Sequence, residues 1–308
     1  MKKWILKALI QKLISFLPGS HKINFWFQKY ITKGVRLSDD YLSDKLQHAK
    51  DHLRFYKEEN PKEAFNSLEI GTGWYPVVPL CMYLAGAQRI LTVDLSPLLN
   101  EAAFRETISK FQSWLKEGKF AEFDPYFVES RKAQFLILEP QKLDLESLMV
   151  ATNIDYQVGD ARSLKEASAG FDLIHSNNVF EHIYPNILSE ILIEFKRLLK
   201  PKGMMSHFID MSDHFAHLDS SINIYNFLSY SDSAWQRIDN SVQPQNRLRL
   251  ADYQELYQQC GLEIIKMEAR PGEPELLKSM KLAEPFASRE PKELAISHVH
   301  LVNTLKNA

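Results

Sequence analysis

The chain has few of the residues and segments that define several broad classes of protein. Its 308 residues include two cysteines, Cys81 and Cys260, which are too few for a disulfide framework or a cysteine-ligated zinc site. No stretch reaches the roughly 18 consecutive apolar residues that a membrane-spanning helix needs. The formal net charge is −2, whereas nucleic-acid-binding domains usually carry a strongly basic face. These absences favour a globular protein in a reducing, cytoplasmic setting with no nucleic-acid partner.

Two of only 11 glycines end the first predicted strand, in the segment Asn66-Ser-Leu-Glu-Ile-Gly-Thr-Gly-Trp-Tyr-Pro76. Glycine adopts turn conformations and lets the backbone approach a ligand closely, because it has no Cβ. A second apolar strand ends on Asp94 about twenty residues later, the arrangement of a nucleotide-binding βαβ unit with an acid placed for ribose hydroxyls. A Gly-x-Gly turn alone is a weak signal, and a purely structural turn is the simpler interpretation.

Apolar runs of strand length alternate with helical patterns, which predicts a parallel sheet with right-handed crossovers. We expect a helix after each of the first five strands. A helix over 250–260 should precede the sixth strand, with Gly261 as its C-terminal cap. The expected strands cover residues 65–70, 89–94, 154–158, 171–176, 203–209, 262–269 and 296–304.

Five segments resemble, in the right order, the motifs of class I S-adenosylmethionine-dependent methyltransferases of the methyltransferase-11 type. They are Glu69 with Gly71 and Gly73, Asp94, Gly159-Asp160-Ala161, the run from Phe171-Asp-Leu-Ile through Glu181-His182, and Leu198-Leu-Lys-Pro-Lys-Gly203. The resemblance covers roughly residues 65–270. It implies an enzyme that transfers a methyl group from S-adenosylmethionine. The implied fold is α/β, a doubly wound, seven-stranded, mostly parallel sheet whose seventh strand is antiparallel.

The resemblance places the cofactor-binding residues at the ends of predicted strands. They are Glu69, Gly71, Thr72, Gly73, Asp94, Leu95, Asp160, Ala161 and Asn177. Ligands of doubly wound sheets bind at the carboxyl ends of strands near the switch point. By resemblance, Asp94 accepts the ribose hydroxyls, Asp160 with the Ala161 amide reads the adenine edge, and Glu69 orders the glycine loop and the methionine ammonium. For any single acid, a surface charge is the simpler interpretation.

The glycine loop departs from the family pattern, since Tyr75 stands where a third glycine is usual and Trp74 precedes it. In dinucleotide enzymes that glycine allows close helix–strand packing beside a pyrophosphate. S-adenosylmethionine has no phosphate, so the departure argues against a nicotinamide dehydrogenase. The two aromatic side chains either cover the methionine end of the cofactor or pack in the core.

A cluster of imidazoles and carboxylates follows the fifth predicted strand, in Asp210-Met-Ser-Asp-His-Phe-Ala-His-Leu-Asp219. The cofactor supplies the electrophile, while the protein positions the acceptor and removes a proton from a hydroxyl acceptor. We predict Asp213 and His214 as a catalytic carboxylate–imidazole pair, with His182 as a further catalytic candidate. For His182, a structural or positioning role is the favoured alternative.

The same cluster admits two other interpretations. Imidazoles and carboxylates are usual ligands of divalent cations, so Asp213, His214, His217 and Asp219 could hold one. Alternatively these side chains only order the loop. The prediction assigns no metal.

Two segments, residues 17–33 and 213–235, resemble methyltransferases of bacterial surface-polysaccharide and glycolipid gene clusters. Flat apolar faces beside hydrogen-bonding groups suit a sugar site. The aromatics in question are Tyr225, Phe227, Tyr230 and Trp235, and core packing is the alternative. This resemblance implies polysaccharide biosynthesis, by O-methylation of a glycan or lipid-linked sugar. The alternatives are a small-molecule or lipid methyltransferase and a non-catalytic protein that binds the cofactor.

We divide the chain into a helical extension over residues 1–62 and a methyltransferase domain over 63–308. The domain carries a helical insert at about 98–152 and a substrate loop at about 209–250. Residues 1–17 form a basic amphipathic helix, which suits peripheral contact with the inner membrane surface. The alternative is a helix that covers the core or the substrate as a lid.

Overall fold

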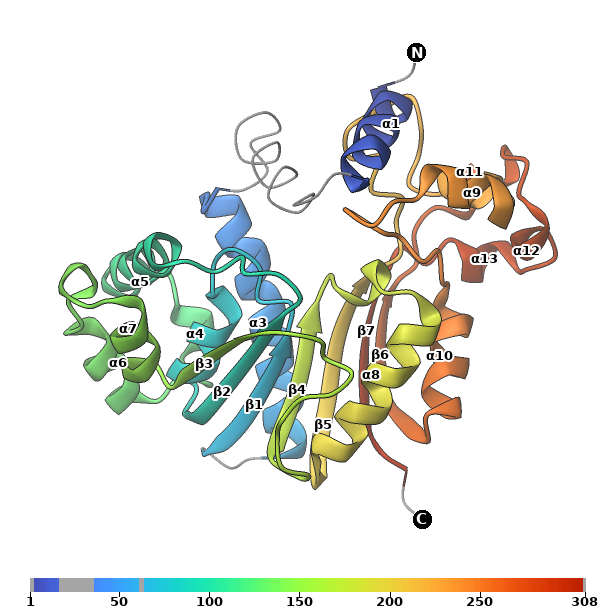
Figure 1. Cartoon of the computed structure of the whole chain (residues 1–308). Coiled ribbons are helices and arrows are strands. Elements are labelled where there is room, and N and C mark those ends of the chain that lie inside the picture. The colour runs from blue at the N-terminus through green and yellow to red at the C-terminus, as the bar shows by residue number, and fades with distance from the viewer. Residues whose placement is uncertain (1–2, 17–35, 61–63, 307–308) are drawn as a thin grey trace. The chain divides into compact units, whose positions relative to one another are not determined.

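The computed structural model describes residues 3–16, 36–60 and 64–306, and its centre is one seven-stranded sheet (Figure 1). The strand order is β3-β2-β1-β4-β5-β7-β6, with six strands parallel and β7 antiparallel. The strands are β1 Phe65–Ile70, β2 Ala87–Asp94, β3 Ile154–Val158, β4 Phe171–Asn177, β5 Leu199–Asp210, β6 Leu262–Arg270 and β7 His298–Leu305. This order and direction confirm the predicted fold class.

The central strand β1 lies between β2 and β4 and pairs in parallel with both. Leu68 aligns with Leu91 on one side and with Ile174 on the other, and all three side chains are buried. Strands covered on both faces read as continuous apolar runs, which is why this part of the sheet was visible in the sequence. Parallel pairing also brings the carboxyl ends of these strands to one edge.

The chain divides into two compact units, which we describe separately. Unit 1 comprises residues 1–34, 178–190 and 207–301, and unit 2 comprises residues 35–177, 191–206 and 302–308. The helix α1 (Lys3–Ser15) belongs to unit 1 and α3 (Asp39–Glu59) to unit 2. The helix α8 (Pro185–Leu198) contributes to both.

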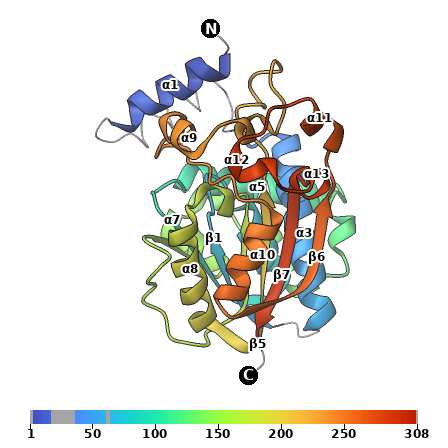
Figure 2. The same cartoon turned by 90° about the vertical axis from the view of Figure 1, so that its right-hand side faces the viewer.

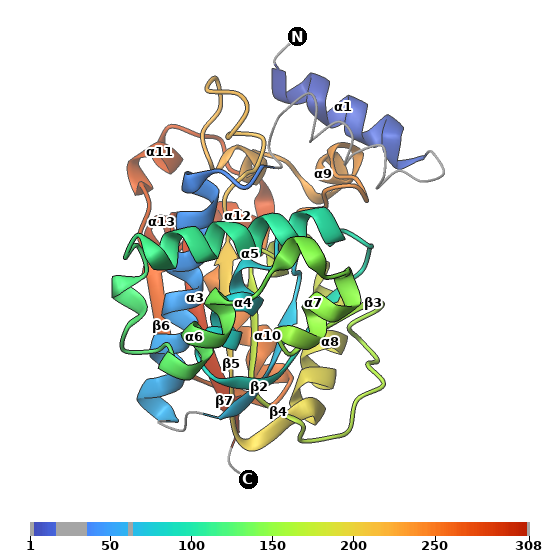
Figure 3. The same cartoon turned by 90° about the vertical axis from the view of Figure 1, so that its left-hand side faces the viewer.

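In unit 2, α4 (Val77–Leu84) packs on β2, and three further helices form the predicted insert. They are α5 (Glu101–Lys116), α6 (Glu129–Leu136) and α7 (Leu145–Ala151), which lie together in Figures 1 and 3. The helical segment that ends the insert is divided between α6 and α7. A 3-10 turn at Pro140–Lys142 separates α6 from α7, because proline lacks the N–H that a continuing helix needs.

The expected helix between β3 and β4 is absent from this fully described connection, since residues 159–170 form turns. The segment lacks the apolar stripe that a helix needs to pack, and Leu164 is its one large buried apolar side chain. Arg197 of α8 instead donates hydrogen bonds to the carbonyl oxygens of Glu166 and Leu164 and to Ser168 Oγ. Hydrogen bonds to one arginine therefore replace helical packing here.

In unit 1, α10 (Leu250–Gln259) packs on β6, and α1 contacts α9 (Asp232–Ile238), as Figure 2 also shows. Three short helices follow β6: α11 (Pro274–Lys278), α12 (Glu284–Ala287) and α13 (Pro291–Leu294). Gly261 follows α10 with a φ of 70°, which confirms the predicted C-terminal cap. The buried Arg249 guanidinium donates to the carbonyl oxygens of Met211, Leu294 and Ile296 and so connects the residue after β5 with the end of α13 and the segment before β7.

The Tyr225 hydroxyl is a second connection within unit 1, and it predicts the effect of a substitution at Gly272. Tyr225 donates to the Ala295 carbonyl at 2.8 Å and accepts the Glu273 N–H at 2.9 Å. A Cβ at Gly272 would lie 1.9 Å from the Ala295 carbonyl oxygen and 2.3 Å from the Tyr225 hydroxyl, at a φ of 60°. Gly272→Ala should therefore lower the free energy of unfolding by roughly 3 kcal/mol or more.

Gly118→Ala is the matched control, because Gly118 has a φ of 70° but no atom within 4 Å of the added Cβ. We expect it to cost about 1 kcal/mol through backbone strain alone. Urea unfolding of both variants measures the difference. Equal losses in the two variants would contradict the packing at Gly272.

Candidate functional site

The glycine loop after β1 has the backbone conformation that its sequence suggested. Gly71 and Gly73 have φ values of 84° and 70°, in the left-handed region that favours glycine. The Gly71 N–H donates to the Val93 carbonyl at 2.8 Å, and the Gly73 N–H donates to Asp94 Oδ2 at 3.1 Å. The ends of β1 and β2 are thus joined through the loop.

Glu69 is a buried carboxyl group near the end of β1. Its Oε2 accepts a hydrogen bond from Thr92 Oγ1 at 3.0 Å, and the Thr92 hydroxyl also contacts that of Thr72. His175 Nδ1 of β4 lies 3.9 Å from Oε1. Burial raises the pKa of Glu69 to about 8 against the opposing effect of the Thr92 bond, and the Asp94 charge raises it further. In this state Glu69 holds a proton at neutral pH.

Asp94 ends β2 and is largely buried. Burial raises its pKa to about 7, although hydrogen bonds from the Gly73 N–H, Thr72 and Tyr156 oppose this effect. The Tyr156 hydroxyl comes from the neighbouring β3 and also accepts the Leu98 N–H at 3.0 Å. Tyr156 therefore fixes both the acid and the turn that follows it.

Asn177, at the end of β4, has a fixed side-chain orientation. Its Oδ1 lies 2.9 Å from His52 Nε2, and His52 Nδ1 lies 2.7 Å from Ser206 Oγ. Burial lowers the pKa of His52 to about 3, so the ring is neutral, with Nε2–H donating to Asn177 and Nδ1 accepting from Ser206. The Asn177 amide nitrogen is buried and has no hydrogen-bond partner within the described residues.

The residues of unit 2 fit S-adenosylmethionine on chemical grounds. Ribose hydroxyls and an ammonium group are donors that suit the carboxylates of Asp94 and Glu69. A buried amide donor without a partner, such as that of Asn177, is costly unless a ligand accepts from it. The two left-handed glycines leave room for the ligand beside the backbone.

The remaining predicted cofactor residues differ in their surroundings. Thr72 and Ala161 are buried, and Leu95 is 74% exposed. The Asp160 side chain is 46% exposed and binds Arg162, with Nη2 2.6 Å from Oδ2. The predicted contact of Asp160 with adenine would have to compete with that ion pair.

Tyr75 packs against the core of unit 2, which supports the packing interpretation of this loop aromatic. Its ring lies edge-to-face with that of Tyr41 from α3, at a centroid distance of 5.8 Å. Burial, and then the Glu69 charge, raise the pKa of Tyr41 above its usual range. The residue that replaces the third glycine therefore anchors α3 to the glycine loop.

In unit 1, several imidazoles surround the carboxylate of Asp210, the last residue of β5. His214 Nε2 lies 3.3 Å and His217 Nε2 3.9 Å from Oδ2, while His298 Nε2 lies 3.4 Å from Oδ1. Burial alone would raise the pKa of Asp210, but the neighbouring imidazoles of His214 and then His298 hold it below its usual range. Asp210 is therefore ionised.

The expected pair of Asp213 with His214 is not the one that forms. Asp213 Oδ1 accepts the Phe215 N–H at 2.9 Å and its Oδ2 accepts from Asn226 Nδ2 at 3.0 Å, whereas Asp210 is the carboxylate beside His214. Asp219 accepts the N–H groups of Trp4 and Ser221. Both acids thus order the loop and the start of α1, as one of the open interpretations held.

His182 lies near the same cluster, with its ring 4.9 Å from that of His214. Its Nδ1 lies 2.6 Å from the Pro244 carbonyl oxygen and must donate to it. Burial, and then the His214 charge, lower the pKa of His182 to about 4. At neutral pH it is therefore a neutral imidazole whose Nε2 carries no proton.

The aromatics expected at a sugar site are mostly core residues of unit 1. Tyr225, Phe227 and Trp235 are buried and pack in one apolar cluster. Tyr230 is half-buried, and its ring packs on the edge of Trp4 at 5.9 Å. The first three do not offer exposed faces for a sugar ring, which favours the core-packing alternative for them.

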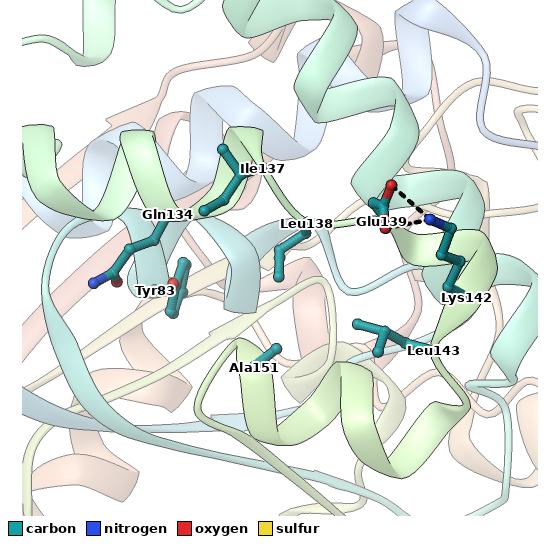
Figure 4. A pocket seen from close by; sticks show the side chains of 8 residues that line it. All are labelled: Tyr83, Gln134, Ile137, Leu138, Glu139, Lys142, Leu143 and Ala151. Atoms are coloured by element: carbon teal, nitrogen blue, oxygen red, sulfur yellow. Dashed lines mark hydrogen bonds and ion pairs between the residues drawn. The ribbon is translucent and has the colours of Figure 1, made fainter.

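A hollow of about 420 Å³ lies in the helical insert of unit 2. Figure 4 shows its lining residues: Tyr83, Gln134, Ile137, Leu138, Glu139, Lys142, Leu143 and Ala151. Tyr83 and Ala151 lie near the ends of α4 and α7, shortly before β2 and β3 begin. The hollow is thus near the amino ends of these strands. It is separate from the strand-end site, by which we mean Glu69, Asp94 and Asn177 at or near the carboxyl ends of β1, β2 and β4.

Sequence reasoning missed Tyr156, His52, Asp210 and His298 as site residues. Asp210 lies inside the segment that the sequence singled out, and its position at a strand end could have identified it. The other three lie on elements distant in sequence from the groups they contact, and no local pattern marked them.

Comparisons with known proteins agree with this chemistry. The methyltransferase domain family (Methyltransf_11) matches residues 132–206, which is a minority of the chain. This match supports an S-adenosylmethionine-dependent methyltransferase and S-adenosylmethionine as the cofactor. A search of curated protein sequences found no match.

Solved structures with a related arrangement include the PH0226 protein of Pyrococcus horikoshii, at 14% identity, a TM-score of 0.47, and coverage of 91% of this chain and 98% of that one. A methyltransferase of Methanosarcina mazei has 14% identity, a TM-score of 0.45, and coverage of 80% and 95%. A phosphoethanolamine N-methyltransferase of Haemonchus contortus has 16% identity, a TM-score of 0.45, and coverage of 83% and 52%. Similarities this low carry no argument about substrate or mechanism.

The raised pKa values of Glu69 and Asp94 predict that affinity for S-adenosylhomocysteine depends on pH. Both groups hold protons below about pH 7 in the free protein, whereas donors of the ligand favour the ionised carboxylates. Affinity should therefore increase between about pH 6 and about pH 8, by up to about tenfold per pH unit for each proton released. Calorimetry in buffers of different ionisation enthalpy measures the released protons.

Asp94→Asn is the control, because it keeps the shape of the side chain and removes one titration. It should release fewer protons than the unsubstituted chain. An affinity that stays flat over this range, with no heat that depends on the buffer, would contradict the assigned roles of the two acids.

Proposed function

We propose that the protein is an S-adenosylmethionine-dependent methyltransferase that methylates an oxygen atom of its acceptor. The observation that carries this proposal is the set of groups at the ends of β1, β2 and β4: Glu69, Asp94 and Asn177. The cofactor supplies an electrophilic methyl group. Asp94 accepts the ribose hydroxyls, Glu69 accepts from the methionine ammonium, and Asn177 donates from its free amide.

The imidazole–carboxylate cluster of unit 1 supports an oxygen acceptor. A hydroxyl group must lose a proton during methyl transfer, either to a base or after polarisation by a cation. His214 with Asp210 offers such chemistry, and we propose His214 as the central residue of this function. His182 positions the His214 ring from the side. Asp213 was also predicted as catalytic, but its hydrogen bonds support a role in ordering the loop.

The surface of α1 supports an acceptor that is presented at a membrane, such as a lipid-linked sugar. Four residues of α1 are buried: Trp4, Ala8, Gln11 and Ile14. Leu6, Leu9 and Leu13 of α1, together with Phe16 directly after the helix, form an exposed apolar stripe; they are 47%, 50%, 68% and 75% exposed. The helix contains no acidic residue that would repel an anionic lipid surface, and amphipathic helices lie in such surfaces with their apolar side inserted.

No helix within the described residues is both long and apolar enough to cross a bilayer. The membrane contact that we propose is therefore peripheral contact of the α1 stripe.

Two variants separate cofactor binding from methyl transfer. Asp94→Ala should lower S-adenosylhomocysteine affinity by at least about 100-fold, since it removes the ionised acceptor of two hydroxyl hydrogen bonds. His214→Ala should leave that affinity unchanged and lower turnover by about 100-fold or more. Calorimetry and transfer of labelled methyl groups measure the two effects. Normal turnover by His214→Ala would refute the role of the cluster.

The acceptor can be sought with methyl-labelled S-adenosylmethionine, purified protein and extracts of the source cells, separated into lipid and aqueous fractions. Label in the lipid fraction is the expected result. Label confined to water-soluble material would favour free sugars or metabolites. Cofactor binding without any label transfer would favour a non-catalytic role for the protein.

The stripe of α1 is tested by Leu9→Gln combined with Leu13→Gln, which remove apolar area without changing charge. Because burial of each leucine contributes about 1.5 kcal/mol or more, binding to vesicles with anionic lipid should fall by at least about tenfold. Co-sedimentation measures it. Ile137→Gln with Val150→Gln is the control, as these exposed residues lie on the insert. Equal effects of the two pairs, or no binding by the unsubstituted chain, would reject the membrane contact.

A further inference from the structure

The side chains around Asp210 in unit 1 are more numerous than general base catalysis needs. A base requires one imidazole and one group that orients it. Here His214 and His217 both direct Nε2 toward the same oxygen, Oδ2 of Asp210. The second imidazole on one carboxylate oxygen is not explained by proton transfer.

We propose that Asp210, His214 and His217 bind a divalent transition-metal ion. Their ligand atoms all lie within 4.8 Å of one another. Metal–ligand bonds of about 2.0–2.2 Å place neighbouring ligand atoms of a tetrahedral ion about 3.3–3.6 Å apart. His214 Nε2 is already 3.3 Å from Asp210 Oδ2, and His217 Nε2 is at 3.9 Å.

The surroundings of these three residues suit metal binding. The Ser212 N–H donates to Asp210 Oδ1 at 2.8 Å and His298 Nε2 faces the same oxygen at 3.4 Å. These contacts orient the carboxylate and leave Oδ2 for the ion, as outer contacts do at known metal sites. The His217 side chain is 62% exposed, so it can close the remaining distance and gives the ion a path from solvent.

A second possible ligand set shares His214, namely Glu181 and His182 with His214. The Asp210 set is favoured because one more imidazole, that of His298, faces its carboxylate and because His217 is accessible to solvent. Glu181, in contrast, is buried. Substitution of Glu181 therefore becomes part of the test.

The ligand types identify the class of ion. Two imidazoles and one carboxylate with open positions suit zinc, iron(II) and related ions, whereas calcium and magnesium prefer oxygen ligands alone. A bound ion of this class would polarise an acceptor hydroxyl. The inference rests on the proposed function only for that role. It replaces the sequence-based prediction that no metal is bound.

The test uses the untagged full chain, dialysed against chelator and titrated with ZnCl2 in a calorimeter. We expect one ion per chain, and a loss of at least about 100-fold in affinity for both Asp210→Asn and His217→Ala. Co²⁺ in place of Zn²⁺ gives visible absorption bands that report the coordination geometry. Asp219→Asn is the matched control, since Asp219 binds the start of α1, and it should bind zinc as the unsubstituted chain does.

Absence of saturable zinc binding would overturn the proposal, as would equal affinity in Asp210→Asn, His217→Ala and the control. Loss of zinc in Glu181→Gln with retention in His217→Ala would assign the ion to the other ligand set and also reject the proposal. S-adenosylhomocysteine binding is measured on the same samples. Its retention without zinc binding would leave the methyltransferase proposal intact, whereas loss of both by a chain whose circular dichroism shows it to be folded would overturn both proposals.

Discussion

Burial of the Glu69 carboxyl group controls the charge of the strand-end site in unit 2. A pKa near 8 corresponds to a cost on the order of 5 kcal/mol for the ionised form relative to water. In the free protein this cost keeps Glu69 protonated at neutral pH, because Thr92 alone cannot replace the hydrogen bonds of solvent. Asp94 is likewise a buried acid whose pKa is raised, and the Asn177 amide nitrogen is a buried donor without a hydrogen-bond partner among the described residues. A ligand that donates to the acids and accepts from the amide relieves all three costs together.

The cluster around Asp210 in unit 1 follows the opposite electrostatic rule. Its carboxylate is as removed from water as that of Asp94, yet its pKa falls, because imidazoles of His214 and His298 stabilise the ionised form. Unit 2 thus holds two acids, Glu69 and Asp94, that ionise when a ligand donates hydrogen bonds to them. Unit 1 holds the ionised carboxylate of Asp210 with imidazoles around it. The first arrangement suits an organic ligand with hydroxyl and ammonium groups. The second suits a proton or a cation, which is why we assign the acceptor chemistry to unit 1.

The sequence allowed the sheet to be predicted because strands buried on both faces are continuous apolar runs. The glycine loop was predictable for a similar local reason, as positive φ favours glycine. The hydrogen-bond and packing partners of individual side chains could not be predicted from the sequence. Asp213 directly precedes His214 in the sequence, whereas Asp210 lies four residues before it, yet the path of the loop after β5 turns Asp213 toward Asn226 and leaves Asp210 beside His214. Likewise, Tyr225 and Trp235 resemble a sugar site in composition, and only tertiary packing shows that they form the core of unit 1.

The amphipathic pattern of α1 shows that a correct helical periodicity does not determine which face of the helix packs on the protein. The sequence pattern places Leu6, Leu9, Leu13 and Phe16 on one apolar side, but the helix packs through Trp4, Ala8, Gln11 and Ile14. Packing depends on shape and on specific partners. Asp219 binds the Trp4 N–H, and Lys12 Nζ donates to the carbonyl oxygens of Gln236 and Asp239. These polar contacts fix the lysine-bearing flank on unit 1, and an exposed leucine stripe is the necessary consequence. A stripe so exposed is costly in water, and a surface that covers it would remove that cost.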